Sequence, residues 1–134
     1  MIRVVLDTNV LISAVLSPNG PPARILQLAL ARAEVELCLS GAVYAEYEEV
    51  LRRPRLRRSE AEIESILRAV HDCGFWVKPT RRVTACLDPD DDIFLECAEA
   101  SEAEYLVTGN LRDFPTSWDK TQIVSPRDLV DALL

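Results

Sequence analysis

The sequence predicts a single α/β domain over residues 1–134, with a central, mostly parallel five-stranded sheet that helices cover on both faces. Short apolar runs alternate with segments of helical periodicity along the whole chain, which is typical of parallel strands joined by helical crossovers. The length fits one hydrophobic core, and no linker or internal repeat divides it. With 49% hydrophobic and 28% charged residues, we expect the chain to fold alone.

The first half of the chain is predicted to hold two strands and three helices. Its opening run, residues 2–6, is apolar and rich in β-branched residues, which suits a strand buried on both faces. Ser40 is placed to cap a helix, and Pro54 stops that helix. In chain order, we expect a strand at 2–6, a helix after Asp7-Thr8-Asn9, a loop at 17–22, a helix at 23–32, a strand at 35–39 and a helix from 40 to about 53.

The second half is predicted to continue the alternation with three more strands. Gly74 ends one helix, and Pro89 suits the first position of another. In chain order, we expect a helix at 59–72, a strand at 75–77, a helix opening at Asp88-Pro89, strands at 105–108 and 122–124, and a closing helix at 126–134.

Composition and motif content exclude several classes of protein. The 15 basic and 22 acidic side chains give a net charge of −7, so the chain as a whole does not attract polyanions. No apolar run approaches the roughly 20 residues of a membrane helix, and we expect a cytoplasmic protein. The four cysteines have no C-x-x-C spacing and predict buried thiols, not a zinc site. No glycine-rich phosphate loop or serine nucleophile elbow is present.

Acidic side chains are predicted to gather at the carboxyl edge of the sheet, where α/β proteins bind ligands. Asp7 ends the first strand, and Thr108-Gly109-Asn110 with Asp113 follows the fourth. The acidic run 88–92 precedes that strand, and Glu46 falls at the edge of the buried stripe of its helix. Acids from separate elements repel one another unless cations join them. Mg²⁺ or Mn²⁺ held this way activates water and stabilises the oxyanions of phosphodiester cleavage, in two-metal form with ions about 3.5 to 4 Å apart.

Each of these side chains also has a structural alternative that the sequence leaves open. Asp7 could cap the next helix, and the acids of 88–91 could simply favour a helix N-terminus. Glu46 could be a solvated helix residue. Thr8 and Thr108 could orient a carboxylate, contact phosphate or serve as buried caps.

Several motifs together resemble a PIN domain, and the likeness spans nearly the whole chain. They are Asp7-Thr8-Asn9-Val10-Leu11-Ile12, Glu46, Asp88-Pro89-Asp90-Asp91-Asp92 with Leu95 and Ala98, and Leu106-Val107-Thr108-Gly109-Asn110 followed by Asp113-Phe114-Pro115. More narrowly, the sequence resembles the PIN branch described as toxins of toxin–antitoxin systems, relatives of the VapC ribonucleases. The resemblance implies a three-layer α/β/α sandwich, Mg²⁺-dependent cleavage of RNA, frequent homodimerisation and neutralisation by a small cognate antitoxin.

The resemblance also implies a set of four acids that bind Mg²⁺ or Mn²⁺. The third acid is placed at Asp92, with Asp91 as its nearest rival. The chain departs from the pattern at the fourth position, where Asn110 stands and Asp113 is the substitute. The implied catalytic and metal-binding residues are Asp7, Glu46, Asp92 and Asp113, and the supporting ones are Thr8, Asn9, Asp91, Thr108 and Asn110.

Charge is strongly segregated, because residues 88–104 hold eight acids and no base while residues 52–58 hold five arginines. The arginine cluster could bind RNA phosphates beside the acidic crevice, or it could be a solvated helix junction. Arg81 and Arg82 could extend the basic surface. The clustered arginines are Arg52, Arg53, Arg55, Arg57 and Arg58.

Three functions are compatible with these patterns, and a metal-dependent ribonuclease is the leading one. A catalytically inactive PIN-like module that binds RNA or protein is the second, and Asn110 is the feature that supports it. A protein that carries an aspartyl phosphate is the third. It is disfavoured because Asn9 replaces the second acid of a phosphatase D-x-D, and because Val77 ends its strand without the acceptor Asp of a receiver.

Overall fold

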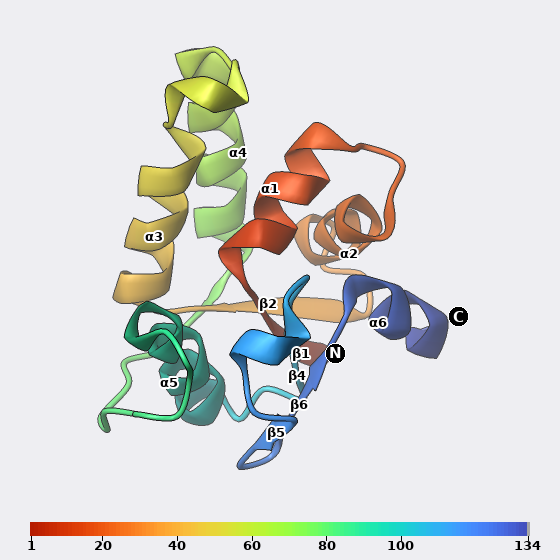
Figure 1. Cartoon of the computed structure of the whole chain (residues 1–134). Helices are drawn as coiled ribbons and strands as arrows, with labels where there is room; N and C mark the ends of the chain where they lie inside the picture. Colours follow the sequence, from red (N-terminus) through yellow and green to blue (C-terminus); the bar gives the residue numbers. More distant parts are fainter. Residues whose placement is uncertain (134) are drawn as a thin grey trace.

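A computed structural model, which describes residues 1–133, shows a six-stranded sheet between helices (Figure 1). The strand order is β3-β2-β1-β4-β6-β5, and every neighbouring pair is parallel except β5 with β6. The α/β class and the mostly parallel sheet are therefore as predicted. The strands are β1 (Ile2–Leu6), β2 (Val35–Leu39), β3 (Phe75–Trp76), β4 (Tyr105–Val107), β5 (Ser117–Trp118) and β6 (Thr121–Val124).

The predicted number of five strands is wrong, because the sequence analysis did not find β5. This edge strand has only two residues and pairs antiparallel with β6 across the turn at Asp119 and Lys120. Asp119 has a φ of 52°, in the left-handed region that tight turns use. Two residues are too few for an alternation of apolar and polar side chains to be recognised.

The helices form layers on the two faces of the sheet. In Figure 1, α1, α2 and α4 lie on one face and α5 lies on the other, while α6 packs beside α2. Helix α3 contacts α1, α4 and α5, so it stands where the layers meet. The α-helices are α1 (Thr8–Leu16), α2 (Pro21–Leu30), α3 (Gly41–Leu51), α4 (Glu60–Cys73), α5 (Asp92–Ser101) and α6 (Pro126–Leu133); short 3₁₀ helices are η1 (Pro54–Leu56), η2 (Pro89–Asp91) and η3 (Leu111–Asp113).

Most predicted helix boundaries hold, and one differs in a way that matters for the site. The side chain of Ser40 caps α3 by accepting a hydrogen bond from the Val43 N–H at 3.2 Å. The helix predicted to open at Asp88-Pro89 begins as the 3₁₀ helix η2, and α-helical geometry starts only at Asp92. The last residue of the predicted closing helix, at position 134, lies outside the described residues.

The hydrophobic core surrounds the central strands and extends to α3. Val4, Val5 and Leu6 of β1 are completely buried, as a central parallel strand requires. The buried Tyr47 of α3 donates its hydroxyl hydrogen to the Leu6 carbonyl at 2.5 Å. This bond holds α3 against the carboxyl end of β1, where Asp7 follows. Among the described helices, we find none with the length and apolar character to cross a membrane.

Candidate active site

Asp7 is the buried centre of the carboxyl edge of the sheet. It occupies the N-cap position of α1, yet its side chain makes no capping hydrogen bond. Instead, its Oδ2 accepts a hydrogen bond from the Thr108 hydroxyl at 2.8 Å, across the β1–β4 pair. Burial raises the pKa of Asp7 above its ordinary value, and the Thr108 hydroxyl offsets part of that rise. The geometry therefore removes the capping alternative and leaves Asp7 as a carboxylate held in place by its neighbours.

The turn after β4 is tied to the segment after β1 by a short network. The Thr108 hydroxyl accepts a hydrogen bond from the Asn110 N–H at 3.0 Å, and the Gly109 N–H donates to the Asn9 side-chain oxygen at 3.1 Å. A Cβ at Gly109 would lie 3.4 Å from that oxygen, so the two segments approach closely. The Thr108 hydroxyl and the Asn9 side chain therefore join the two segments beside Asp7, whereas the Asn110 side chain forms no hydrogen bond within residues 1–133.

Asp91 and Asp92, the two candidates for the third acid, have different surroundings. Asp92 is buried, and its Oδ1 accepts hydrogen bonds from the backbone N–H groups of Ala85 and Cys86 at 3.1 and 2.8 Å. Burial opposes its charge, but those N–H groups more than offset this and lower the pKa of Asp92. Its carboxylate therefore holds the 83–87 segment against α5.

Asp91 instead faces the other acids of the site. Burial, followed by repulsion from Asp7, Asp88 and Asp113, raises the pKa of Asp91 from 3.8 to about 6. The placement of the third acid at Asp92 stays a prediction, and the repulsion from Asp7 and Asp113 falls on Asp91, the rival position. The physical reason is η2, because each residue of a 3₁₀ helix turns the chain by about 120° and consecutive acids point in different directions.

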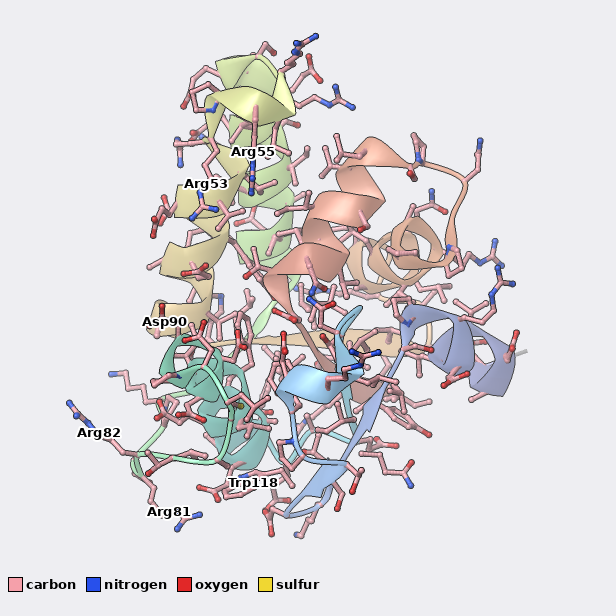
Figure 2. The ribbon with its side chains drawn as sticks, in the orientation of Figure 1. Arg53, Arg55, Arg81, Arg82, Asp90 and Trp118 are labelled. Atoms are coloured by element: carbon pink, nitrogen blue, oxygen red, sulfur yellow. The ribbon has the colours of Figure 1, made fainter. Side chains whose placement is uncertain are left out.

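Two further acids complete the cluster, from α3 and from η3. Burial and the neighbouring Glu49 raise the pKa of Glu46, with smaller contributions from Asp90 and Asp7. Asp113 is half-buried in η3 and contributes to the raised pKa values of both Asp7 and Asp91. Asp90 was not among the predicted site residues, although its charge contributes to the raised pKa of Glu46. Figure 2 shows its place beside the start of α3.

The donor set of this cluster suits a hard divalent cation, because it consists of carboxylate oxygens without histidine or cysteine. The buried hydroxyl of Thr8, next to Asp7, has no hydrogen-bond partner among residues 1–133 and is a further oxygen donor at the site. Within the same residues, however, no three acidic, histidine or cysteine side chains already stand close enough to hold one ion. The residue types of the cluster fit Mg²⁺ or Mn²⁺.

The arginine cluster is largely paired with glutamates of α3 and α4. Arg52 contacts three of them, with the shortest N···O distance being 2.9 Å to Glu64. Arg53 lies 3.6 Å from Glu49, and Arg58 lies 3.9 Å from Glu62. Figure 2 shows Arg53 and Arg55 at the end of α3 remote from Asp90. The cluster is therefore a mixed-charge surface, not a uniformly basic one.

Arg81 and Arg82 belong to the loop between β3 and η2, and their side chains have different surroundings. The Arg81 guanidinium makes two hydrogen bonds to the Glu99 carboxylate of α5, at 3.0 and 2.6 Å. Together with the bonds of Asp92, this ion pair fastens the loop that leads to the acidic run. Arg81 thus has a structural contact, while Arg82 extends outward from the loop (Figure 2).

Comparisons with known proteins identify relatives of this arrangement. The family model described as "PIN domain" matches residues 3–112. An uncharacterized protein of Methanocaldococcus jannaschii, MJ1680, is 35% identical over 112 residues, which cover 81% of this chain and 71% of the relative. A chain in the crystal structure of VapBC2 from Rickettsia felis, bound to a DNA fragment from the promoter, has a similar fold with a TM-score of 0.60 and 14% identity. That match covers 92% of this chain and 98% of the other.

Proposed function

Because the chain belongs to the PIN domain family, we propose that it is a ribonuclease that hydrolyses RNA phosphodiester bonds with Mg²⁺ or Mn²⁺. The observation that carries the proposal is that acids from three separate elements meet at one edge of the sheet, where Asp7 and Asp113 raise the pKa of Asp91 and Asp113 raises the pKa of Asp7. Such an arrangement is electrostatically costly without a cation. A set of partly buried acids that repel one another at the edge of a parallel sheet supports a function in cation binding.

The side chains have distinct roles in this proposal. Asp7, held by Thr108, supplies the central carboxylate, and Asp91 with Asp113 supplies the charges beside it. Glu46 faces them from α3, and the Tyr47 bond to β1 holds that helix in place. A divalent cation, when bound, lowers the pKa of water and stabilises negative charge on phosphate oxygens. Asp92 acts indirectly, by fixing the loop in front of Asp91.

Cleavage of RNA by the purified protein tests the proposal directly. We expect cleavage with Mn²⁺ or Mg²⁺ and none with EDTA, and we expect Asp7→Asn to lower the rate by at least about 100-fold, because the central carboxylate that would hold the cation loses its charge. Equal cleavage by the wild type and Asp7→Asn would point to contamination or to another site. Binding of RNA at saturating Mn²⁺ without any cleavage would instead favour the non-catalytic module.

We propose three partners for this chain, namely RNA as substrate, a small antitoxin protein and a second copy of the chain. The antitoxin is supported by the structure of similar fold, which by its description is a VapBC2 assembly. The family resemblance supports the homodimer. The activity would be exerted in the cytoplasm, where RNA and a cognate antitoxin are both present.

Arg53 is the member of the arginine cluster that we propose contacts RNA. It lies two residues beyond the end of α3, where the chain becomes extended. Its positive charge opposes the rise in the pKa of Glu46 that burial and Glu49 cause. Its pairing with the exposed Glu49 is weak enough to be exchanged for a phosphate.

Arg53→Ala is expected to raise KM for RNA about threefold to tenfold, with little change in kcat, because one phosphate contact is lost. The slope of log KM against log salt should fall by about one. Arg24→Ala, which removes an exposed arginine of α2, is the matched control and should have no such effect. Equal effects of the two variants would assign the change to net charge alone.

A further inference from the structure

We propose that a cavity beside the carboxylates binds the nucleobase next to the scissile phosphate, and that the Asn110 side chain reads this base. The proposal rests on the ribonuclease function above and adds a source of sequence preference. The cavity has a volume of about 310 Å³. Its polar lining comes from Asn9, Ser13 and Asn110, and its apolar lining includes Pro22 and Pro126. It therefore lies among α1, the starts of α2 and α6, and the turn after β4.

The size and lining of the cavity suit one flat, neutral group. Its volume is at the lower end of the range of small-molecule pockets, which is about 300 to 1,000 Å³. No charged residue lines it, and the acidic cluster lies directly beside it. The lining therefore offers no arginine or lysine to bind an anion.

The two helix N-termini at the cavity do not make it a phosphate site. Pro22 and Pro126 stand in the first turns of α2 and α6 and have no N–H group to donate. In α6, the N–H groups of Asp128 and Leu129 already bond to the side-chain and main-chain oxygens of Ser125. Several of the donors that usually hold a phosphate are thus absent or already used, which favours a neutral base as the group that fits.

Asn110 is positioned to read such a base while its own backbone stays fixed. Its N–H is bound to the Thr108 hydroxyl, which in turn donates to Asp7, so only these two bonds separate it from the central carboxylate. Its side-chain amide is exposed and has no hydrogen-bond partner in the part of the chain that the structure describes. An amide offers two donors and an acceptor, which match the edge of an unpaired base.

The connection to Asp7 determines which nucleotide the cavity would receive. A phosphate at the acidic cluster places the adjoining base within reach of the turn after β4. Ser13, one helical turn after Asn9 on α1, also lines the cavity. RNA-binding proteins commonly read single-stranded bases in this way, by apolar contact with the faces and hydrogen bonds to the edges. The chain would therefore prefer particular bases at one position beside the cleaved bond.

The test uses two substrates, a library of single-stranded RNA with randomised sequence and bis(p-nitrophenyl) phosphate, a diester without a base. Ser13→Trp fills the cavity, Asn110→Ala removes the amide, and Ser65→Trp on the exposed face of α4 is the matched control. We expect Ser13→Trp to lower kcat/KM for RNA about tenfold or more and to leave hydrolysis of the small diester, with Mn²⁺, within about twofold.

Asn110→Ala should flatten the base preference at one position beside the cut, by about threefold or more, while cutting continues at other sequences. The proposal would be overturned if Asn110→Ala kept the base preference of the wild type. It would also be overturned if Ser13→Trp cleaved RNA as fast as Ser65→Trp does. An equal loss of cleavage rate on all RNA sequences in Asn110→Ala would also overturn it. Asn110 would then contact the sugar–phosphate backbone of the RNA and not a base. If the wild type hydrolyses neither substrate, the ribonuclease function itself fails, which is a distinguishable result.

Discussion

Asp91→Asn is expected to lower kcat/KM for RNA by at least about 100-fold, whereas Asp92→Asn should remain within about threefold of the wild type. The two substitutions are chemically identical and adjacent in sequence, so the contrast isolates where each side chain points. The negative charges of Asp7 and Asp113 disfavour ionisation of Asp91 and raise its pKa. Asp92 uses its Oδ1 to accept two backbone hydrogen bonds, and an asparagine oxygen can accept them as well.

Asp92→Ala provides the complementary result for the same pair. It leaves the N–H groups of Ala85 and Cys86 without their acceptor, which should cost about 1 to 3 kcal/mol in the free energy of unfolding. Urea unfolding followed by circular dichroism measures this loss. A large loss of activity in Asp92→Asn, with full activity in Asp91→Asn, would restore Asp92 as the third acid.

Mn²⁺ is expected to stabilise the protein strongly at pH 7.5 and only weakly at pH 5. A ligand at 100 times its Kd raises the free energy of unfolding by about 2.7 kcal/mol, provided that it binds the folded state alone. Binding requires ionised carboxylates, and Asp91, with a pKa of about 6, is largely protonated at pH 5. Urea unfolding at both pH values, with Mn²⁺ or with EDTA, measures the difference.

Without metal, the contribution of Asp91 to the free energy of unfolding should decrease as the pH rises. The folded pKa of Asp91 is raised from 3.8 to about 6, so the folded state binds this proton more tightly than the unfolded chain does. Its contribution to stability is fully present below about pH 4 and is lost as the pH rises through about 6. After allowance for solvent screening, it amounts to about 1 kcal/mol.

Asp91→Asn is the control for both pH effects. It should abolish this contribution and most of the stabilisation by Mn²⁺ at pH 7.5. If Mn²⁺ stabilises the variant as much as the wild type, the ion binds elsewhere on the protein.

The local pattern of the chain is sufficient to predict the fold class and much of the site. The apolar runs of β1 and β4 end in Asp7 and Thr108, and parallel strands bring their carboxyl ends to one edge. The bond between Thr108 and Asp7 follows from that register. Periodicity also located most helices, because an amphipathic stripe is a property of the sequence alone.

Three features depended on contacts between distant segments and were decided only by the tertiary structure. The different surroundings of Asp91 and Asp92 depend on the 3₁₀ turn of η2 and on the loop that Asp92 holds. Three arginines of the cluster, Arg52, Arg53 and Arg58, are paired because α3 and α4 place glutamates beside them. The short strand β5 exists because β6 offers it an edge. The sequence determines which charged groups and hydrogen-bond donors are present. Which group each of them contacts is determined by the packing of the folded chain.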